Sequence, residues 1–372
     1  MDDIFDLDSV NLEALSEGEE EVVIEAVPTE EEYWKFPTDA LASFLQLASQ
    51  FSWRSGRDLT SKSVSLSTSE DRTTLVCRAT DFDSYLSVKI PLQSSKPIST
   101  TLIFPTSTLI KLVPLSPKSM VMKKDAVLIM GQWVGVETTI LDPHSFIQED
   151  PVEMSGNITL PNLSSVIPIA NSASVPRDRN IRFYKDSIQS TCLWTELRIP
   201  FNSPVSFTLS SRETNLLTKL GKELKVGVTQ SDLQRLVFES PTTTLWLLYR
   251  EPDTQESSID TPDWKLQIEH PALSKIVAMS ETLPSSSGLL QFQYTNQFIV
   301  TYTSRLSNTP FTLSSVSTGT PTQLQPSTVQ TKILKLYLKP LNSDTLYISW
   351  DSTALYLSNS DSSVKVSMKW EA

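Results

Sequence analysis

Few side chains in this sequence have the type and spacing that enzymatic chemistry requires. The clearest pair is Asp81 and Asp83, which a β-strand would place on one face because they are two residues apart. Two neighbouring carboxylates can hold a metal ion, but no third acidic ligand follows at a similar spacing. Aspartate also favours turns, since its side chain accepts hydrogen bonds from the nearby backbone. A turn therefore explains this pair better than a metal site.

The remaining reactive residue types are isolated. The two histidines, His144 and His270, lie far apart and next to prolines. HExxH, CxxC and GxSxG motifs are absent, and Gly221-Lys222 lacks the upstream glycine and the following serine or threonine of a phosphate-binding loop. We therefore expect no catalytic residue, no metal and no cofactor, and a protein that is not an enzyme.

Length and composition indicate a globular protein. The chain has 372 residues, 39% of them hydrophobic and 20% charged, which suits two or three domains. No run approaches the ~20 apolar residues that cross a bilayer, so we expect no membrane partner. Cys77 and Cys192 lie in apolar, strand-like runs and do not form a disulfide framework. The opening MDDIFDLD lacks the apolar core of a signal peptide, so we expect a cytoplasmic protein (in the bacterial cytoplasm or nucleoid, or in an infected host cell).

The negative charge is concentrated at one end of the chain. Residues 1–32 contain thirteen Asp and Glu and no Lys or Arg, whereas the whole chain has 43 acidic and 31 basic residues. Residues 33–372 therefore carry 30 acidic and 31 basic side chains, so they form a near-neutral body. Dense like charges oppose compaction, and we expect residues 1–32 to form a disordered acidic tail. The tail either keeps the protein soluble or binds a partner, and a polyanion can also compete with nucleic acid for a basic surface.

Short amphipathic helices alternate with strands along the body. Six segments space their apolar residues three and four apart, as a helix with one buried face does. Five carry a proline near their start, and the fourth instead has Ser210 and Glu213 spaced as a capping box. The runs between them alternate apolar and polar residues and are rich in aromatic and β-branched types, which indicates strands. The helices are expected in 36–48, 104–113, 160–170, 209–220, 270–279 and 325–336, and the clearest strands in 73–80, 84–92, 180–186, 289–295, 298–304, 344–350 and 354–360.

The predicted helices recur at intervals that indicate an internal repeat. Their starts are roughly 50 to 70 residues apart, which suggests six units of one helix plus a small antiparallel sheet. Grouped in pairs, the units predict an α+β fold with three tandem domains at 33–148, 149–256 and 257–372. Acidic, proline-bearing stretches join them, as is typical of linkers. A solenoid or a propeller is the structural alternative, although propeller blades have no helix in each unit.

In this order and spacing the units resemble the bacterial DNA polymerase sliding clamp, or beta clamp, family. Residues 78–86 (RATDFDSYL) are similar to the family's first strand–turn–strand, 101–109 (TLIFPTSTL) to the strand entering its second helix, and 364–369 (VKVSMK) to its last strand. The resemblance covers about 340 residues, everything except the tail, and rests on order and length more than on any one motif. The divergence and the acidic tail are compatible with a phage or plasmid origin.

The resemblance implies a polymerase processivity factor. Each chain of a homodimer would contribute three clamp domains, half of a closed ring around double-stranded DNA, and would bind DNA polymerase and an ATP-dependent clamp loader. Phosphate contacts would hold the DNA without reading its sequence, so the ring could slide. Surface helices commonly carry lysine, but here basic residues recur on or just after all six predicted helices. The side chains expected to face DNA are Arg54, Arg57, Lys111, Lys118, Arg177, Arg179, Arg212, Lys219, Lys222, Lys275, Lys332, Lys335 and Lys339.

The same resemblance implies where two subunits would meet. The last strand of the first domain would contact the first helix of the third domain of the other subunit. A core position is the ordinary alternative for Met279. The residues implied are Trp133, Val136 and Thr138 on the strand, with Ala278 and Met279 on the helix.

A cleft between the second and third domains would bind partner peptides. The turn at 191–197 is shorter than the family's and lacks its histidine. Either the cleft is reshaped for other peptides, or Trp194 is a core aromatic. One wall would contain Leu193, Trp194 and Leu197, and the other Val364, Val366 and Met368.

Other classes of function remain open from the sequence. A clamp-fold transcription cofactor would use the acidic tail to contact RNA polymerase. A structural β-rich virion protein would have no affinity for circular DNA. A nuclease with a metal on Asp81 and Asp83 is the most distant alternative.

Overall fold

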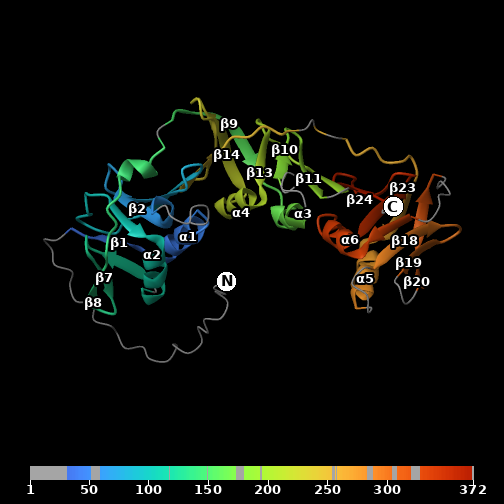
Figure 1. Ribbon diagram of the computed structural model, residues 1–372, viewed down its shortest axis with the longest axis horizontal. Helices are drawn as coiled ribbons and strands as arrows, with labels where there is room; N and C mark the ends of the chain where they lie inside the picture. The colour runs from blue at the N-terminus through green and yellow to red at the C-terminus, as the bar shows by residue number, and fades with distance from the viewer. Residues whose placement is uncertain are drawn as a thin grey trace.

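The chain forms an open arc of three lobes, with the helices along the inner, concave side and the sheets on the outer side (Figure 1). Residues 1–31 of the predicted acidic tail lie outside the described residues. In the described part of the chain, no helix has the length and apolar character needed to cross a membrane. The computed structural model describes residues 32–51, 59–116, 118–148, 150–172, 180–192, 195–253, 256, 258–282, 288–303, 308–319 and 327–370.

The six α-helices in the described ranges pack in pairs, α1 with α2, α3 with α4 and α5 with α6. Five of these helices begin at the residue directly after a strand, so the sheet fixes where each one starts. The exception is α3, which follows a single turn of 3-10 helix at Leu163–Ser165. The helices are α1 (Thr38–Ala48), α2 (Thr106–Leu112), α3 (Ile167–Ser172), α4 (Ser211–Leu220), α5 (His270–Glu281) and α6 (Thr331–Leu338).

Two four-stranded antiparallel sheets lie at the two ends of the arc (Figure 1). Each has an edge strand with many exposed side chains, β8 in the first lobe and β20 in the third. In sheet order the first contains β1 (Trp34–Pro37), β6 (Ser119–Met122), β7 (Ala126–Ile129) and β8 (Gln132–Gly135). The last contains β20 (Asn308–Leu313), β19 (Phe298–Thr303), β18 (Leu289–Tyr294) and β22 (Ser327–Gln330).

An eight-stranded antiparallel sheet joins the first lobe to the second. The joining strands are β4 and β16, where Leu86 pairs with Leu245 and Tyr85 with Trp246. Because the backbone ladder continues across the junction, the two lobes share one sheet. In order its strands are β5 (Leu102–Pro105), β2 (Ser63–Thr68), β3 (Thr74–Thr80), β4 (Tyr85–Pro91), β16 (Thr243–Leu248), β15 (Arg235–Glu239), β14 (Glu223–Thr229) and β9 (Val152–Thr159).

A nine-stranded antiparallel sheet joins the second lobe to the third in the same way, through β12 and β25. The predicted domain limits at 148 and 256 fall outside the strands and helices, while these two sheets continue from lobe to lobe. The division into three domains therefore stays a prediction. In order the strands are β13 (Phe207–Ser210), β10 (Asn180–Phe183), β11 (Ser187–Cys192), β12 (Thr195–Pro200), β25 (Lys365–Lys369), β24 (Ala354–Asn359), β23 (Thr345–Trp350), β17 (Lys265–Glu269) and β21 (Ser315–Thr318).

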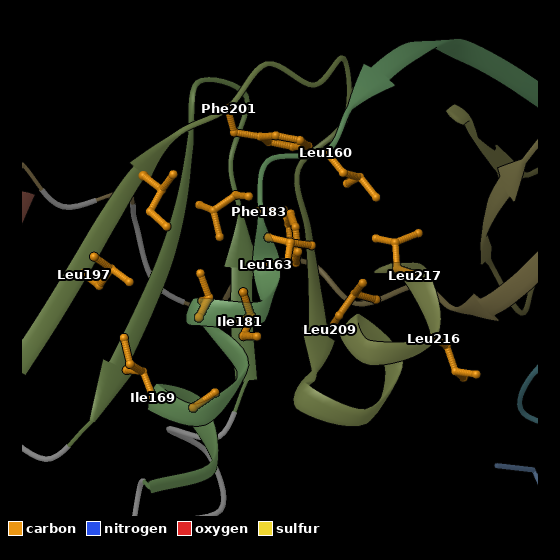
Figure 2. Packing of buried hydrophobic residues seen from close by; sticks show 14 of the residues in the cluster. Leu160, Leu163, Ile169, Ile181, Phe183, Leu197, Phe201, Leu209, Leu216 and Leu217 are labelled. Carbon is orange, nitrogen blue, oxygen red and sulfur yellow. The ribbon is translucent and has the colours of Figure 1, made fainter. Parts of the chain in front are cut away.

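The core of each lobe lies between its helices and the inner faces of its sheets. In the middle lobe, Phe183 stacks on Phe207 with ring centroids 4.6 Å apart and meets Phe201 edge-on at 5.6 Å. Figure 2 shows side chains of this core, which come from the strands, from α3 and α4, and from the connections between them. Burial of these apolar surfaces holds the helices against the sheet and leaves their opposite faces toward the concave side.

Most predicted helices lie close to where the sequence pattern places them. Helices α1, α2, α4 and α5 begin within two residues of the expected start. The sixth does not: residues Ser327–Gln330 form β22, and α6 begins only at Thr331. Val329 pairs with Leu290 of β18, and this sheet pairing takes precedence over local helical periodicity. The third segment was expected as one helix and instead divides into the 3-10 turn and the short α3.

The predicted capping box of α4 is confirmed. The Ser210 amide donates to the Glu213 carboxylate at 2.7 Å, and the Glu213 amide donates to the Ser210 hydroxyl at 3.3 Å. Glu213 is buried, and its carboxylate also pairs with the Arg250 guanidinium, which joins the helix start to the end of β16. Local sequence therefore sets the start of this helix, and a distant cation reinforces it.

Replacing Ser210 with alanine removes the hydroxyl that accepts the Glu213 amide. We expect the free energy of unfolding to fall by about 1 kcal/mol, the usual effect of losing an N-cap. Urea denaturation followed by circular dichroism measures the change. Ser211→Ala, one residue further along and outside the capping box, is the control, and equal losses in both variants would contradict this account.

Candidate functional site

The carboxylates of Asp81 and Asp83 lie at a turn. The Ser84 amide donates to the Asp81 carboxylate at 2.8 Å, which helps to close the connection between β3 and β4. Phe82, between the two aspartates, has a φ of +67°, which is rare for a residue with a Cβ. The turn interpretation of this pair is therefore confirmed. Among the described residues, no three His, Cys, Asp or Glu side chains gather where they could hold a metal ion.

The side chains of Cys77 and His270 serve the packing of the fold. Burial raises the pKa of the Cys77 thiol far above its usual range, so the thiol stays protonated and unreactive. The His270 ring nitrogen Nε2 lies 3.0 Å from the Leu338 carbonyl oxygen, which links the start of α5 to the end of α6. These contacts explain both residues as parts of the fold.

The concave side of the arc carries exposed lysines on its helices. In α6, Lys332 and Lys335 are exposed, while Leu334, Tyr337 and Leu338 of the same helix are buried against the sheet. Helices α2, α4 and α5 show the same division, whereas α1 and α3 contain no Lys or Arg. Of the residues expected to face DNA, Lys111, Lys118, Lys219, Lys222, Lys275, Lys332, Lys335 and Lys339 are exposed, and Arg212 is half-buried. Arg54, Arg57, Arg177 and Arg179 lie outside the described residues.

Acidic side chains on these helices are few or already engaged. Asp39 in α1 is exposed, whereas the charge of Glu213 in α4 is used by the capping box and by Arg250. Glu223 and Glu269 lie just outside α4 and α5. The exposed helical surface therefore has an excess of positive charge, which suits binding to phosphate groups without base recognition.

The residues expected at a subunit interface lie toward the two ends of the arc. Trp133, on edge strand β8, has an exposed fraction of 37%, and the Lys123 ammonium lies 4.1 Å from its ring centroid. At the other end, Met279 of α5 has an exposed fraction of 45%, and Ala278 beside it is exposed. Met279 is therefore not a core residue of its own chain.

The remaining interface residues differ in exposure. Thr138 is exposed, but Val136 is buried in its own lobe, where its amide donates to the Asp125 carbonyl at 2.8 Å. Within one chain the two sets cannot meet, because they lie in the first and third lobes (Figure 1). Contact between them needs a second copy, and that contact stays a prediction.

The residues expected to line a peptide cleft lie where the second and third lobes join. Leu197 of β12 pairs with Val366 of β25, and Thr195 with Met368. Leu197, Val366 and Met368 are fully buried, and Val364 is nearly so, so a peptide would contact them only if the surrounding structure opened. Leu193 and Trp194 lie outside the described residues. The peptide site therefore stays a prediction.

An ionic network that the sequence does not reveal lies on the outer face of this same junction. The Arg182 guanidinium donates to the Asp253 carboxylate at 2.9 Å, and that of Arg198 donates to the Glu256 carboxylate at 2.7 Å. The Ser187 hydroxyl also donates to Glu256, at 2.6 Å. The network fastens the acidic connection between the second and third lobes to β10, β11 and β12. The partners are 58 to 71 residues apart, so only the alternation of Arg with apolar residues in the strands hinted at it.

A buried arginine fastens the first junction. Arg235 of β15 is almost fully buried, and its guanidinium donates to the backbone carbonyls of Phe82, at 3.0 Å, and of Asp83. Its Cζ lies 4.8 Å from the ring centroid of Tyr85. The positive φ of Phe82 is thus held by a side chain from the next lobe, which ties the β3–β4 turn to the middle of the arc.

Comparison with solved structures identifies this arrangement as the DNA-clamp fold. The chains it matches include bacterial beta sliding clamps, the beta subunits of DNA polymerase III. The beta subunit of Streptococcus pyogenes aligns with a TM-score of 0.71 at 12% identity, over 91% of this chain and 99% of that one. The C. crescentus beta sliding clamp gives 0.71 at 11% identity, over 92% and 100% of the two chains. The Helicobacter pylori clamp, bound to a DNA ligase peptide, gives 0.69 at 15%, over 91% and 100%.

These similarities confirm the predicted α+β clamp architecture over nearly the whole chain. No protein-family model and no curated protein matches the sequence. At 10–15% identity the shared property is the fold, so the resemblance is that of a divergent clamp.

Replacing Arg198 with methionine keeps the length of the side chain but removes its ion pair with Glu256. We expect the connection at 251–260 to open more often, with cleavage by a glutamate-specific protease rising by up to roughly five-fold, as the loss of an exposed pair allows. Mass spectrometry of timed digests locates the cuts. Lys369→Met, on the neighbouring strand β25, is the control, and an unchanged cleavage rate in Arg198→Met would contradict the role given to the network.

Proposed function

We propose that this protein is a DNA sliding clamp, a non-enzymatic ring that encircles double-stranded DNA and tethers other proteins to it. One observation carries the proposal: exposed lysines recur on the helices that line the inside of an arc with the clamp fold. Lysine is a compact, mobile charge that contacts phosphate without selecting bases. A surface of this kind suits a duplex that must move past it.

Retention by a ring does not require tight contacts. A closed ring leaves DNA only by opening or by running off an end, so its lifetime on DNA depends on topology. The lysine–phosphate contacts need only centre the duplex, and they weaken steeply as salt rises. The exposed lysines of α2, α4, α5 and α6 supply such contacts from all three lobes.

Closing the ring requires a second copy of the chain. Edge strands such as β8 and β20 present unpaired backbone groups that can extend a sheet into another chain. Trp133 on β8 and Met279 on α5 add exposed apolar surface at opposite ends of the arc. Contacts between unlike ends, repeated by a two-fold axis, would close a homodimer.

We place the partner-peptide site at the junction of the second and third lobes. The Helicobacter pylori clamp with the same fold is bound to a DNA ligase peptide, which supports peptide binding as the tethering mode. The proposed partners are a DNA polymerase and an ATP-dependent clamp loader, and the proposed location is the cytoplasm, where both would meet DNA. Leu197 and Val366 are fully buried at this junction, so a bound peptide would contact them only after the surrounding structure opens.

Retention on circular DNA tests the ring. The protein is loaded onto a nicked circular plasmid with an ATP-dependent clamp loader, freed of unbound protein by gel filtration, and divided in two. One half is cut once with a restriction enzyme. We expect protein to stay on the circles and to leave the linear molecules, because only linear DNA has ends. Reactions without ATP are the control, and equal loss from both forms would reject the ring.

The Met279→Glu substitution tests the contact between subunits. A charge in an interface core must be desolvated, so we expect the dimer Kd to rise by at least roughly ten-fold. Sedimentation equilibrium measures the Kd, and Trp133→Glu should act alike from the other side. Val316→Glu, an exposed apolar residue on β21, is the control. A wild-type chain that stays monomeric at high concentration would contradict the homodimer itself.

A further inference from the structure

We propose that the acidic segment at residues 1–31 binds the lysine-bearing concave face of its own chain when no DNA is present. The segment would act as an internal competitor that duplex DNA displaces. The inference rests on the proposed function for the identity of the displacing ligand, but the contact itself can be measured without DNA.

Charge complementarity favours binding of the acidic segment to the concave face over binding to the rest of the surface. Residues 1–31 contain twelve Asp and Glu and no Lys or Arg, whereas the body beyond residue 32 carries a net charge of about +1. A near-neutral body attracts a polyanion only where its cations gather. The concave helices are such a place, because their basic residues outnumber their acidic ones, Asp39, Glu213 and Glu281, and Glu213 is already paired with Arg250.

One short strand separates the attachment point of the segment from a helix of this face. The described chain begins at Glu32, whose carboxylate lies 3.8 Å from the Lys124 ammonium, and β1 leads from Trp34 directly into α1. The acidic segment therefore joins the body within six residues of a concave helix. Thirty-one residues can span at most roughly 100 Å, so the segment can reach well beyond the helix nearest to its attachment point. Tethering of this kind gives an effective concentration on the order of millimolar.

Charge density explains why DNA would win the competition. Fully extended, the segment presents one negative charge per roughly 8 Å, whereas duplex DNA presents one per about 1.7 Å. DNA also releases condensed counterions when lysines bind it, and a sparse polyanion releases few. The segment would thus reduce weak, adventitious contacts with nucleic acid and still yield to a duplex held inside a ring.

Three proteins test the inference: the full chain, a chain lacking residues 1–31, and a full-length chain with the twelve acids of this segment replaced by Asn and Gln. The third keeps the length of the segment and removes its charge. Both changes lie outside the described body, so they should leave its fold intact, and circular dichroism checks this.

The first measurement uses no DNA. A zero-length carbodiimide joins carboxylates to lysines in contact, and mass spectrometry maps the joined peptides. We expect links from residues 1–31 to Lys111, Lys219, Lys275 or Lys332 at low salt, and their loss at high salt. Lys89 and Lys369, exposed on the outer side of β4 and β25, are the matched controls. Links spread evenly over both sets would overturn the inference.

The second measurement is the affinity for a short duplex. We expect the full chain to bind the duplex roughly ten-fold more weakly than the other two proteins at low salt. A tethered competitor causes a loss of this size when its effective concentration is on the order of millimolar and its Kd for the concave face is about ten-fold lower than that concentration. The difference should vanish at high salt. Equal affinities in all three proteins would overturn the inference and leave the clamp proposal standing. If residues 1–31 cross-link to the concave lysines but none of the three proteins binds DNA, the clamp proposal is rejected and the internal contact stands.

Discussion

The structure depends on two backbone ladders that cross from lobe to lobe. Where β4 pairs with β16, and where β12 pairs with β25, the hydrogen bonds of one lobe continue into the next without a break. At the first crossing the paired Leu86 and Leu245 are both buried, so the two lobes bury the same face of the shared sheet. The helices lie on the concave side (Figure 1), and the natural twist of the shared sheets adds to the curvature of the arc.

At each junction, arginine side chains add hydrogen bonds and ion pairs to the backbone pairing of the strands. At the first, the buried guanidinium of Arg235 satisfies carbonyls in a turn of the neighbouring lobe. At the second, Arg182 and Arg198 hold the acidic connection across the outer face. Arg182 is almost fully buried, as Arg235 is, so each junction contains a buried guanidinium that is costly to leave without its partners, and only the Arg198 pair is more exposed.

Local patterns in the sequence predicted the elements well, and long-range pairing explains where they failed. The capping box of Ser210 and Glu213 depends on only four consecutive residues, and the structure forms it as expected. The helical pattern after residue 325 was misleading because Val329 is drawn into a sheet by Leu290, a partner 39 residues away.

The surfaces were harder to predict than the elements. The exposed lysines of α2, α4, α5 and α6 could be recognised, since they alternate with the buried residues at helical spacing. Family resemblance placed Leu197 and Val366 on opposite walls of a cleft, but their pairing in one sheet and their complete burial depend on packing that the sequence does not display. The pairing of Arg198 with Glu256 was out of reach for the same reason.

The direct passage from strand to helix, described for five of the six helices, limits how the chain can change over evolution. A residue inserted at such a passage would rotate the helix by about 100° and turn its lysines toward the core and its leucines toward water. Insertions should be confined to the hairpins that join strands, where an extra residue is absorbed without rotating a helix. Length variation among related chains would then occur along the outer rim, while the spacing of cations around the inner side is preserved.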